Sequence, residues 1–263
     1  MTLVVTDVSR HGIVAVGDSA LTVTDLDSSE KHVLDTVLGA KLSFVSNAKI
    51  CMAAWGNFGV NGRRLDYWLA DYARDRIKPG MLPRAVAEDL SESLNAALEP
   101  DFRSGITKGL RRGVHVAGYR NGIPELYHVH MGEEKGPHLP LKVHQHSLGD
   151  DPHPDAIRRF LTRSSVHVRN GMWQRFVQRF DRAIEEGGAL KSFNGDLRAR
   201  CEFFSSMIVD VADTLRKAGE LPTVNKAVSA VAFDSEGMVV DMRIPVDGPE
   251  FVQELSGSEQ LAA

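Results

Sequence analysis

Short, mostly apolar runs rich in β-branched residues open the chain. The segment between the first two runs, residues 9–12, contains Ser, His and Gly, the composition of a hairpin turn. If these runs pair as strands, the first residues of the chain and Gly56 meet at one end of a sheet. The predicted strands are residues 2–6, 12–16, 41–45 and 50–54.

Beyond Gly56 the apolar positions change from helical spacing to strand alternation and back. Pro100 follows the second helical run and is expected to end it. This order predicts an α+β fold, a four-layer αββα sandwich, as one domain over residues 1–263 with a frayed tail at 254–263. The predicted helices are residues 65–77, 83–98, 156–161, 172–184 and 197–217, and the later strands are 113–119, 125–130, 141–145, 227–233 and 238–244.

Composition narrows the class of protein. The 263 residues carry a net charge of −4, so bulk charge attracts neither nucleic acid nor an anionic membrane. The sequence has neither an apolar run of eighteen residues nor a basic-then-apolar N-terminus, which argues against a membrane span or secretory signal. The two cysteines, Cys51 and Cys201, lie in apolar surroundings, which suits a reducing compartment. We expect a cytoplasmic protein.

Four residues near the N-terminus suggest nucleophilic catalysis: Thr2, Asp18, Lys41 and Gly56. Removal of the initiator methionine would give Thr2 a free α-amine, which can accept the proton of its own hydroxyl. A buried Lys41 would keep that amine in its basic form, and Asp18 is the natural partner for the buried lysine. Gly56 would let a backbone N–H approach the oxyanion of a tetrahedral intermediate.

These residues and their surroundings resemble the β-subunits of the proteasome family, of the Ntn-hydrolase superfamily. The matching segments are Thr2, residues 15–22, Lys41 and residues 53–56, and the closest resemblance is to the bacterial HslV and Anbu branch. The resemblance implies a threonine that attacks peptide carbonyls, an Asp–Lys pair beneath it and a glycine of the oxyanion hole. A stretch at residues 27–38 lengthens the spacing from the acid to the lysine.

The same resemblance assigns further site residues. A serine that assists the nucleophile corresponds to Ser147, one residue out of place if Gly149 marks the family's glycine. Glu220 and Thr223 stand where active subunits carry an acid and a serine, although a polar turn explains both equally well. An extended peptide substrate would lie as an added strand between residues 20–22 and 56–58. Its expected contacts are Ala20, Thr22 and Asn57.

The resulting hypothesis is an N-terminal threonine peptidase without a cofactor. Its partners would be a peptide or unfolded-protein substrate and further copies of the chain in a homo-oligomeric ring; an ATPase partner is left open. Two alternatives stay open, a non-catalytic scaffold of the same fold and an Ntn amidase acting on a small N-acyl compound. A retained Met1 favours the scaffold, and a small closed pocket favours the amidase.

Six of the ten histidines fall between residues 128 and 153. His128 and His130 share one face of a predicted strand, as do His144 and His146. Such pairs could bind zinc or nickel. No recognised metal motif accompanies them, so we interpret them as half-exposed strand histidines and predict no metal site.

Overall fold

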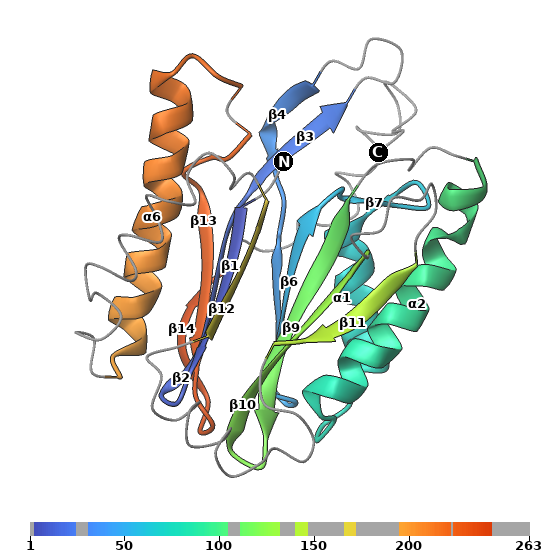
Figure 1. Ribbon diagram of the computed structural model, residues 1–263, viewed down its shortest axis with the longest axis vertical. Coiled ribbons are helices and arrows are strands. Elements are labelled where there is room, and N and C mark those ends of the chain that lie inside the picture. The colour runs from blue at the N-terminus through green and yellow to red at the C-terminus, as the bar shows by residue number, and fades with distance from the viewer. Residues whose placement is uncertain are drawn as a thin grey trace.

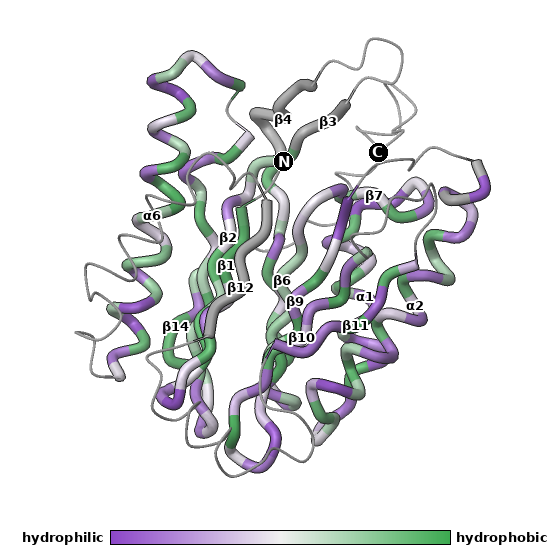
Figure 2. Tube along the Cα trace, viewed as in Figure 1, coloured by the Kyte–Doolittle hydropathy of each residue, from purple (hydrophilic) through white to green (hydrophobic). Residues whose placement is uncertain are grey.

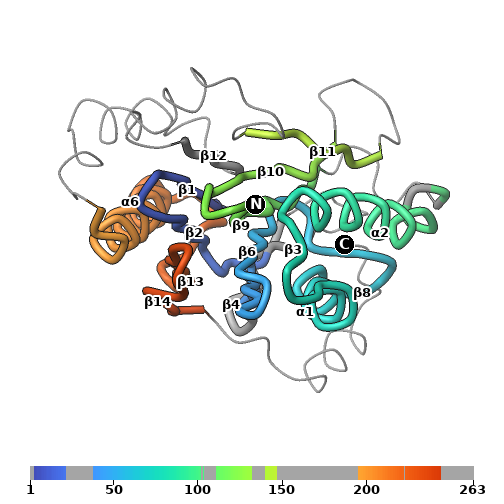
Figure 3. Tube along the Cα trace, turned by 90° about the horizontal axis from the view of Figure 1, so that it is seen from below, coloured from blue at the N-terminus to red at the C-terminus, as the bar shows by residue number. Residues whose placement is uncertain are grey.

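The computed structural model describes residues 3–24, 31–104, 111–131, 140–146, 166–171, 195–221 and 223–243. Two five-stranded antiparallel sheets face each other, with helix α6 outside one sheet and helices α1 and α2 outside the other (Figure 1). The view turned by 90° shows the same separation of α6 from α1 and α2 (Figure 3). The fold is therefore a mixed α+β fold, as predicted.

The first sheet has the strand order β12-β1-β2-β13-β14. Its centre is the N-terminal hairpin, which closes with Ser9 opposite Gly12, as the turn composition predicted. The bounds are β1 Leu3–Ser9, β2 Gly12–Asp18, β12 Val166–Gly171, β13 Val228–Phe233 and β14 Met238–Met242.

The second sheet has the strand order β11-β10-β9-β6-β5. Asn121 and Gly122 form the turn between β9 and β10 with φ values of 51° and 77°, a conformation that the Asn-Gly pair favours. The bounds are β5 Leu42–Val45, β6 Ile50–Gly56, β9 Arg112–Arg120, β10 Ile123–Met131 and β11 Leu141–Gln145.

Two short hairpins complete the strands that the structure describes. Strands β3 (Ala20–Thr24) and β4 (Lys31–Leu38) pair with each other, so part of the stretch that lengthens the Asp18–Lys41 spacing is a hairpin arm. Strands β7 (Gly59–Val60) and β8 (Arg63–Arg64) form a second hairpin immediately after Gly56.

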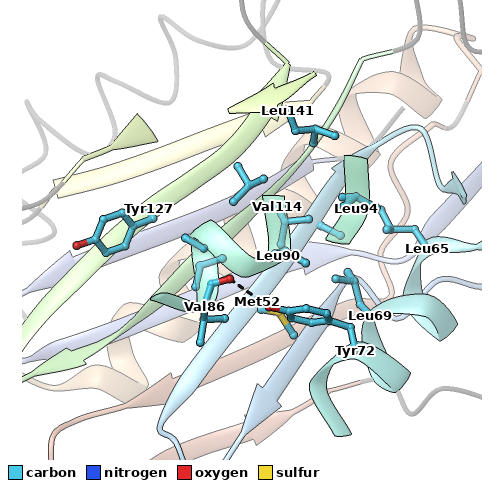
Figure 4. Packing of buried hydrophobic residues seen from close by; sticks show 14 of the residues in the cluster. Met52, Leu65, Leu69, Tyr72, Val86, Leu90, Leu94, Val114, Tyr127 and Leu141 are labelled. Carbon is cyan, nitrogen blue, oxygen red and sulfur yellow. Dashed lines mark hydrogen bonds between the residues drawn. The ribbon is translucent and has the colours of Figure 1, made fainter. Parts of the chain in front are cut away.

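Hydrophobic and hydrophilic residues alternate along the described helices (Figure 2), and buried apolar side chains of each helix pack against its sheet. Helices α1 (Leu65–Arg76) and α2 (Pro83–Ser104) are joined by a hydrogen bond of 3.2 Å from the Tyr72 hydroxyl to the Val86 carbonyl (Figure 4). Helix α6 (Leu197–Lys217) is capped by Asp196, whose side chain accepts the Ala199 N–H at 3.0 Å. A buried stripe follows along α6: Cys201, Phe204, Ile208, Val211 and Leu215.

A third apolar cluster fills the space between the two sheets. The first sheet contributes Val4, Val8 and Ile13, and the second contributes Leu42, Cys51 and other small side chains. The N-terminal hairpin and the β5–β6 pair therefore do not share a sheet. They face each other across this core, and the condition that these strands pair in one sheet was wrong. A short apolar run predicts a buried strand and leaves undetermined the sheet to which that strand belongs.

Two further predictions differ from the structure. Pro100 lies inside α2, which continues to Ser104. The proline removes the hydrogen bond to the Ala96 carbonyl, and both residues are exposed, so water can bind that carbonyl instead. Strand β12 was not predicted, although it pairs with β1 along its whole length, from Leu3–Gly171 to Val8–Val166. The predicted helices at 156–161 and 172–184 and the tail at 254–263 lie outside the described residues. No described helix is both long enough and apolar enough to cross a membrane.

Candidate active site

Asp18 ends strand β2, and its carboxylate is completely buried. Its Oδ1 accepts the backbone N–H of Leu3 at 2.7 Å and the Lys41 ammonium at 2.9 Å. Its Oδ2 accepts the backbone N–H of Ala20 at 2.9 Å. One carboxylate thus joins the start of β1, the end of β2 and Lys41. The hairpin creates this meeting because its register sets Val4 opposite Gly17.

Lys41 is as deeply buried as its partner, with no exposed side-chain surface at either residue. Burial lowers the pKa of the Lys41 ammonium, and the negative charges of Asp18 and then Asp66 oppose that change. The side chain lies along Gly17, where an added Cβ would stand 3.7 Å from the Lys41 Cβ. A buried lysine paired with one carboxylate lowers the proton affinity of any amine close to it.

The backbone next to Lys41 is held by a second acid that sequence reasoning missed. Asp66, in the first turn of α1, accepts the Ala40 N–H at 3.0 Å and forms an ion pair with Arg64. Arg64 also donates to the Leu38 carbonyl at 3.1 Å. An acid in the first turn of a helix usually complements the helix dipole, so its position alone gave no sign of this contact.

Lys41 and Gly56 are linked through strand β6. The Lys41 carbonyl accepts the N–H of Ala54 at 2.8 Å, two residues before Gly56. Gly56 has φ of +86°, a backbone conformation that residues other than glycine rarely adopt. A Cβ added at this position would lie 2.2 Å from the Arg111 carbonyl oxygen. Only glycine fits this position.

Three residues were predicted to contact a substrate: Ala20, Thr22 and Asn57. The backbone N–H groups of two of them already donate to acceptors within the protein. Ala20 gives its N–H to Asp18, and Asn57 gives its N–H to the Arg111 carbonyl at 2.9 Å. The Asn57 side chain accepts the Gly59 N–H at 2.7 Å. The backbone of Thr22 pairs with Val33 of β4. The role of these residues in binding stays a prediction.

Of the remaining predicted site residues, two lie outside the described residues and two lie within them. Thr2 and Ser147 lie outside; Leu3, the residue after Thr2, is the first one described. Thr223 is buried, and Glu220 is partly buried near the end of α6. Two residues beyond Thr223, Asn225 forms a contact next to Asp18 that the sequence did not predict.

That contact joins Asn225 to Ser19. The Asn225 side chain accepts the Ser19 N–H at 3.1 Å and the Ser19 hydroxyl at 3.2 Å. The segment before β13 is thereby attached to the residue that follows Asp18. The two partners are 206 positions apart, so no local pattern in the sequence signals the contact.

Cysteine chemistry does not compete with this site. Both cysteines are free and buried, and burial raises the pKa of the Cys51 thiol to about 12 and of the Cys201 thiol to about 11. Thiols with such pKa values are inert as nucleophiles at neutral pH.

Comparison with solved structures places this geometry in a known fold. Anbu (ancestral β-subunit) from Yersinia bercovieri matches with a TM-score of 0.54 and 13% identity, over 97% of this chain and 92% of that chain. The fold is proteasome-like. Anbu from Hyphomicrobium sp. strain MC1 matches over the same shares of both chains, at 12% identity and a TM-score of 0.49. No protein-family model and no curated protein matches the sequence. The expected proteasome-like fold is confirmed, and at this identity the likeness concerns the fold alone.

Histidines form a second polar cluster in this proteasome-like fold. His115, His128 and His144 lie opposite one another across β9, β10 and β11, and the His128 and His130 ring centroids are 4.1 Å apart. Among the described residues, no three ligating side chains are arranged to hold a metal ion. His128 is only 4% exposed, so the interpretation of half-exposed histidines was wrong for this residue.

The environment of His128 favours its neutral form. Trp55 donates its indole N–H to Nε2 of His128 at 2.8 Å, so that nitrogen acts as an acceptor. Burial lowers the pKa of His128 far below its usual range, and the positive charges that His115, His130, His146 and His144 can carry lower it further. On the facing sheet, the Thr6 hydroxyl lies 2.9 Å from Nδ1 of His115.

This burial predicts a loss of stability in mild acid. Below about pH 6.5 the unfolded chain binds a proton at His128 that the folded chain does not bind, so the free energy of unfolding falls as pH falls. His128→Gln keeps an acceptor for Trp55 and does not titrate. Between pH 7.5 and 5.5 the variant should lose about 1.4 kcal/mol less stability than the wild type. Urea unfolding at both pH values measures the difference, and equal losses would contradict the expectation.

Proposed function

We propose that the protein is an N-terminal threonine hydrolase of the Ntn class that cleaves peptide bonds through Thr2, on a four-layer αββα scaffold. One observation carries the proposal: Leu3 N–H and the Lys41 ammonium donate to the same oxygen of Asp18. Thr2 is bonded to that Leu3 nitrogen. Its α-amine is therefore only three bonds from an N–H that shares a carboxylate oxygen with the Lys41 ammonium. An amine in such a place has the lowered pKa that a general base at neutral pH needs.

Each residue then has a defined part in the reaction. After Met1 is removed, the α-amine of Thr2 takes the proton of its hydroxyl, and the hydroxyl oxygen attacks the substrate carbonyl. The N–H of Gly56 stabilises the resulting oxyanion, and Lys41 keeps the amine unprotonated between turnovers. The amine returns its proton to the leaving nitrogen. Water then hydrolyses the threonyl ester. Ser147 is proposed to assist the nucleophile.

A peptide substrate would lie between β3 and the segment that begins at Gly56. Because the N–H groups of Ala20 and Asn57 donate within the protein, we infer that this peptide pairs mainly with carbonyl groups of the two segments. We further propose a cytoplasmic homo-oligomer formed by the whole chain as a single domain. Enclosure in a ring would restrict access to a groove that selects substrates by their backbone.

The decisive test is intact-mass analysis of the protein purified from its natural host, before and after treatment with a threonine-directed β-lactone. We expect a mature chain that begins at Thr2 and gains one probe mass at that residue. Thr2→Ser should retain labelling because serine keeps the hydroxyl and the α-amine, and Thr2→Ala should lose labelling completely.

Other outcomes discriminate between the functions. A fully retained Met1 would remove the mechanism, because a peptide-bonded nitrogen cannot act as a base. A free Thr2 that never reacts would favour the scaffold. Labelling together with hydrolysis of small N-acyl compounds, and no hydrolysis of peptides, would favour the amidase.

A further inference from the structure

Arg112 begins strand β9 directly opposite Gly56, and its side chain is completely buried. It points to the α2 side of the second sheet, the face it shares with Val114 and Val116. There its Nη1 donates to the carbonyl of Gly59. This guanidinium is thus a buried cation behind the segment that carries the proposed oxyanion glycine.

Among the described residues, little compensates the charge of Arg112. Its Nε and Nη2 are buried and meet no hydrogen-bond acceptor in the part of the chain that the structure describes. Asp101 is the acid whose charge acts on it, and that carboxylate accepts the Asn61 N–H at 2.7 Å. Burial outweighs Asp101 and lowers the pKa of Arg112 to about 10. A buried cation with two unused donors destabilises a fold, so its presence calls for an explanation.

Arg111, immediately before β9, and Arg112, its first residue, contact the Gly56–Gly59 segment at both of its ends. The Arg111 carbonyl accepts the Asn57 N–H at 2.9 Å and lies where a Gly56 side chain would stand. Arg112 holds the other end through the Gly59 carbonyl. These contacts restrict the direction in which the N–H groups of the segment point, a requirement for a preorganised oxyanion hole.

We propose that Arg112 is a positioning residue for the oxyanion hole, which fixes the Gly56–Gly59 segment and places a buried positive charge behind it. This inference rests on the function proposed for Thr2. The guanidinium does not touch the substrate. It acts through the direction of the Gly56 N–H and through the field at the oxyanion, from a buried position where water screens its charge little.

The proposal predicts opposite effects on activity and stability. Arg112→Met retains most of the side-chain volume and removes the charge with its unused donors. We expect the first-order rate of β-lactone acylation, kinact, to fall at least tenfold, with little change in the KI of the probe. The melting temperature should stay equal or rise. Arg112→Lys keeps a charge and one donor that can reach Gly59, so it should recover part of kinact.

Arg120, at the other end of β9, provides a matched control. It forms an ion pair with the buried Glu125, so Arg120→Met leaves that acid without this cation and with the Tyr127 hydroxyl as a side-chain donor. This variant should melt at a lower temperature and acylate at the wild-type rate when both are measured well below their melting temperatures. The two methionine variants should therefore show opposite patterns.

Three results would overturn the inference. A wild-type protein with a free Thr2 that the β-lactone does not label refutes the proposed function and the inference with it. A labelled wild type and an Arg112→Met variant with the same kinact refute the inference alone. A variant that loses kinact only together with a lower melting temperature shows a packing residue rather than a positioning residue.

Discussion

Replacing Lys41 with methionine is expected to lower the free energy of unfolding by about 3–5 kcal/mol and to abolish acylation of Thr2. Both side chains of the native pair have no exposed surface. The substitution therefore leaves the Asp18 carboxylate buried without its cation. It also removes the charge that would keep the threonine amine unprotonated. Chemical unfolding and intact-mass analysis with the β-lactone measure the two effects separately.

The double variant Asp18→Asn/Lys41→Met separates stability from chemistry. Removing both charges should recover part of the lost stability and none of the acylation. Recovery stays partial because an asparagine amide replaces one of the two oxygens that accept the Leu3 and Ala20 N–H groups. A double variant no more stable than Lys41→Met would show that the buried charge is not the cause.

A surface lysine provides the control for the single variant. Lys49 makes its contact on the surface, with the Ser235 carbonyl. Lys49→Met should change the free energy of unfolding by less than about 1 kcal/mol and leave acylation unchanged. Normal acylation in Lys41→Met itself would remove Lys41 from the mechanism.

Gly56→Ala is expected to slow acylation about 100-fold or more and to destabilise the fold. The φ of +86° alone costs an alanine about 1–2 kcal/mol, and its Cβ would stand 2.2 Å from the Arg111 carbonyl oxygen. The backbone must move to relieve this contact, and the N–H that would stabilise the oxyanion moves with it. Acylation kinetics and urea unfolding report the two consequences.

Gly62 separates the backbone effect from the contact. It has a similar φ of +71°, and an added Cβ there meets nothing within 4 Å. Gly62→Ala should therefore lose only about 1–2 kcal/mol of stability and retain wild-type acylation. If Gly56→Ala acylates as fast as Gly62→Ala, the oxyanion hole lies elsewhere.

The sequence was enough to predict most elements and the ion pair between Asp18 and Lys41. The first hairpin, the Asn121-Gly122 turn and the apolar stripe of α6 depend on residues close together in the chain. Asp18 and Lys41 were found because their chemistry and spacing suggested an ion pair, which the structure brings to 2.9 Å. Thr2 and Ser147 stay predictions, since both lie outside the described residues.

Other features depend on packing between distant segments. The sequence determined the hairpins and the burial of their strands, because apolar runs and turn chemistry act over a few residues. Only the tertiary structure decided that the N-terminal hairpin and β6 lie in facing sheets, that Asp66 holds the backbone before Lys41, and that Arg112 is buried behind Gly56. The local sequence around an acid or an arginine looks the same whether the side chain lies on the surface or in the interior. What distinguishes them is which distant segment covers them, and packing of the whole chain decides that.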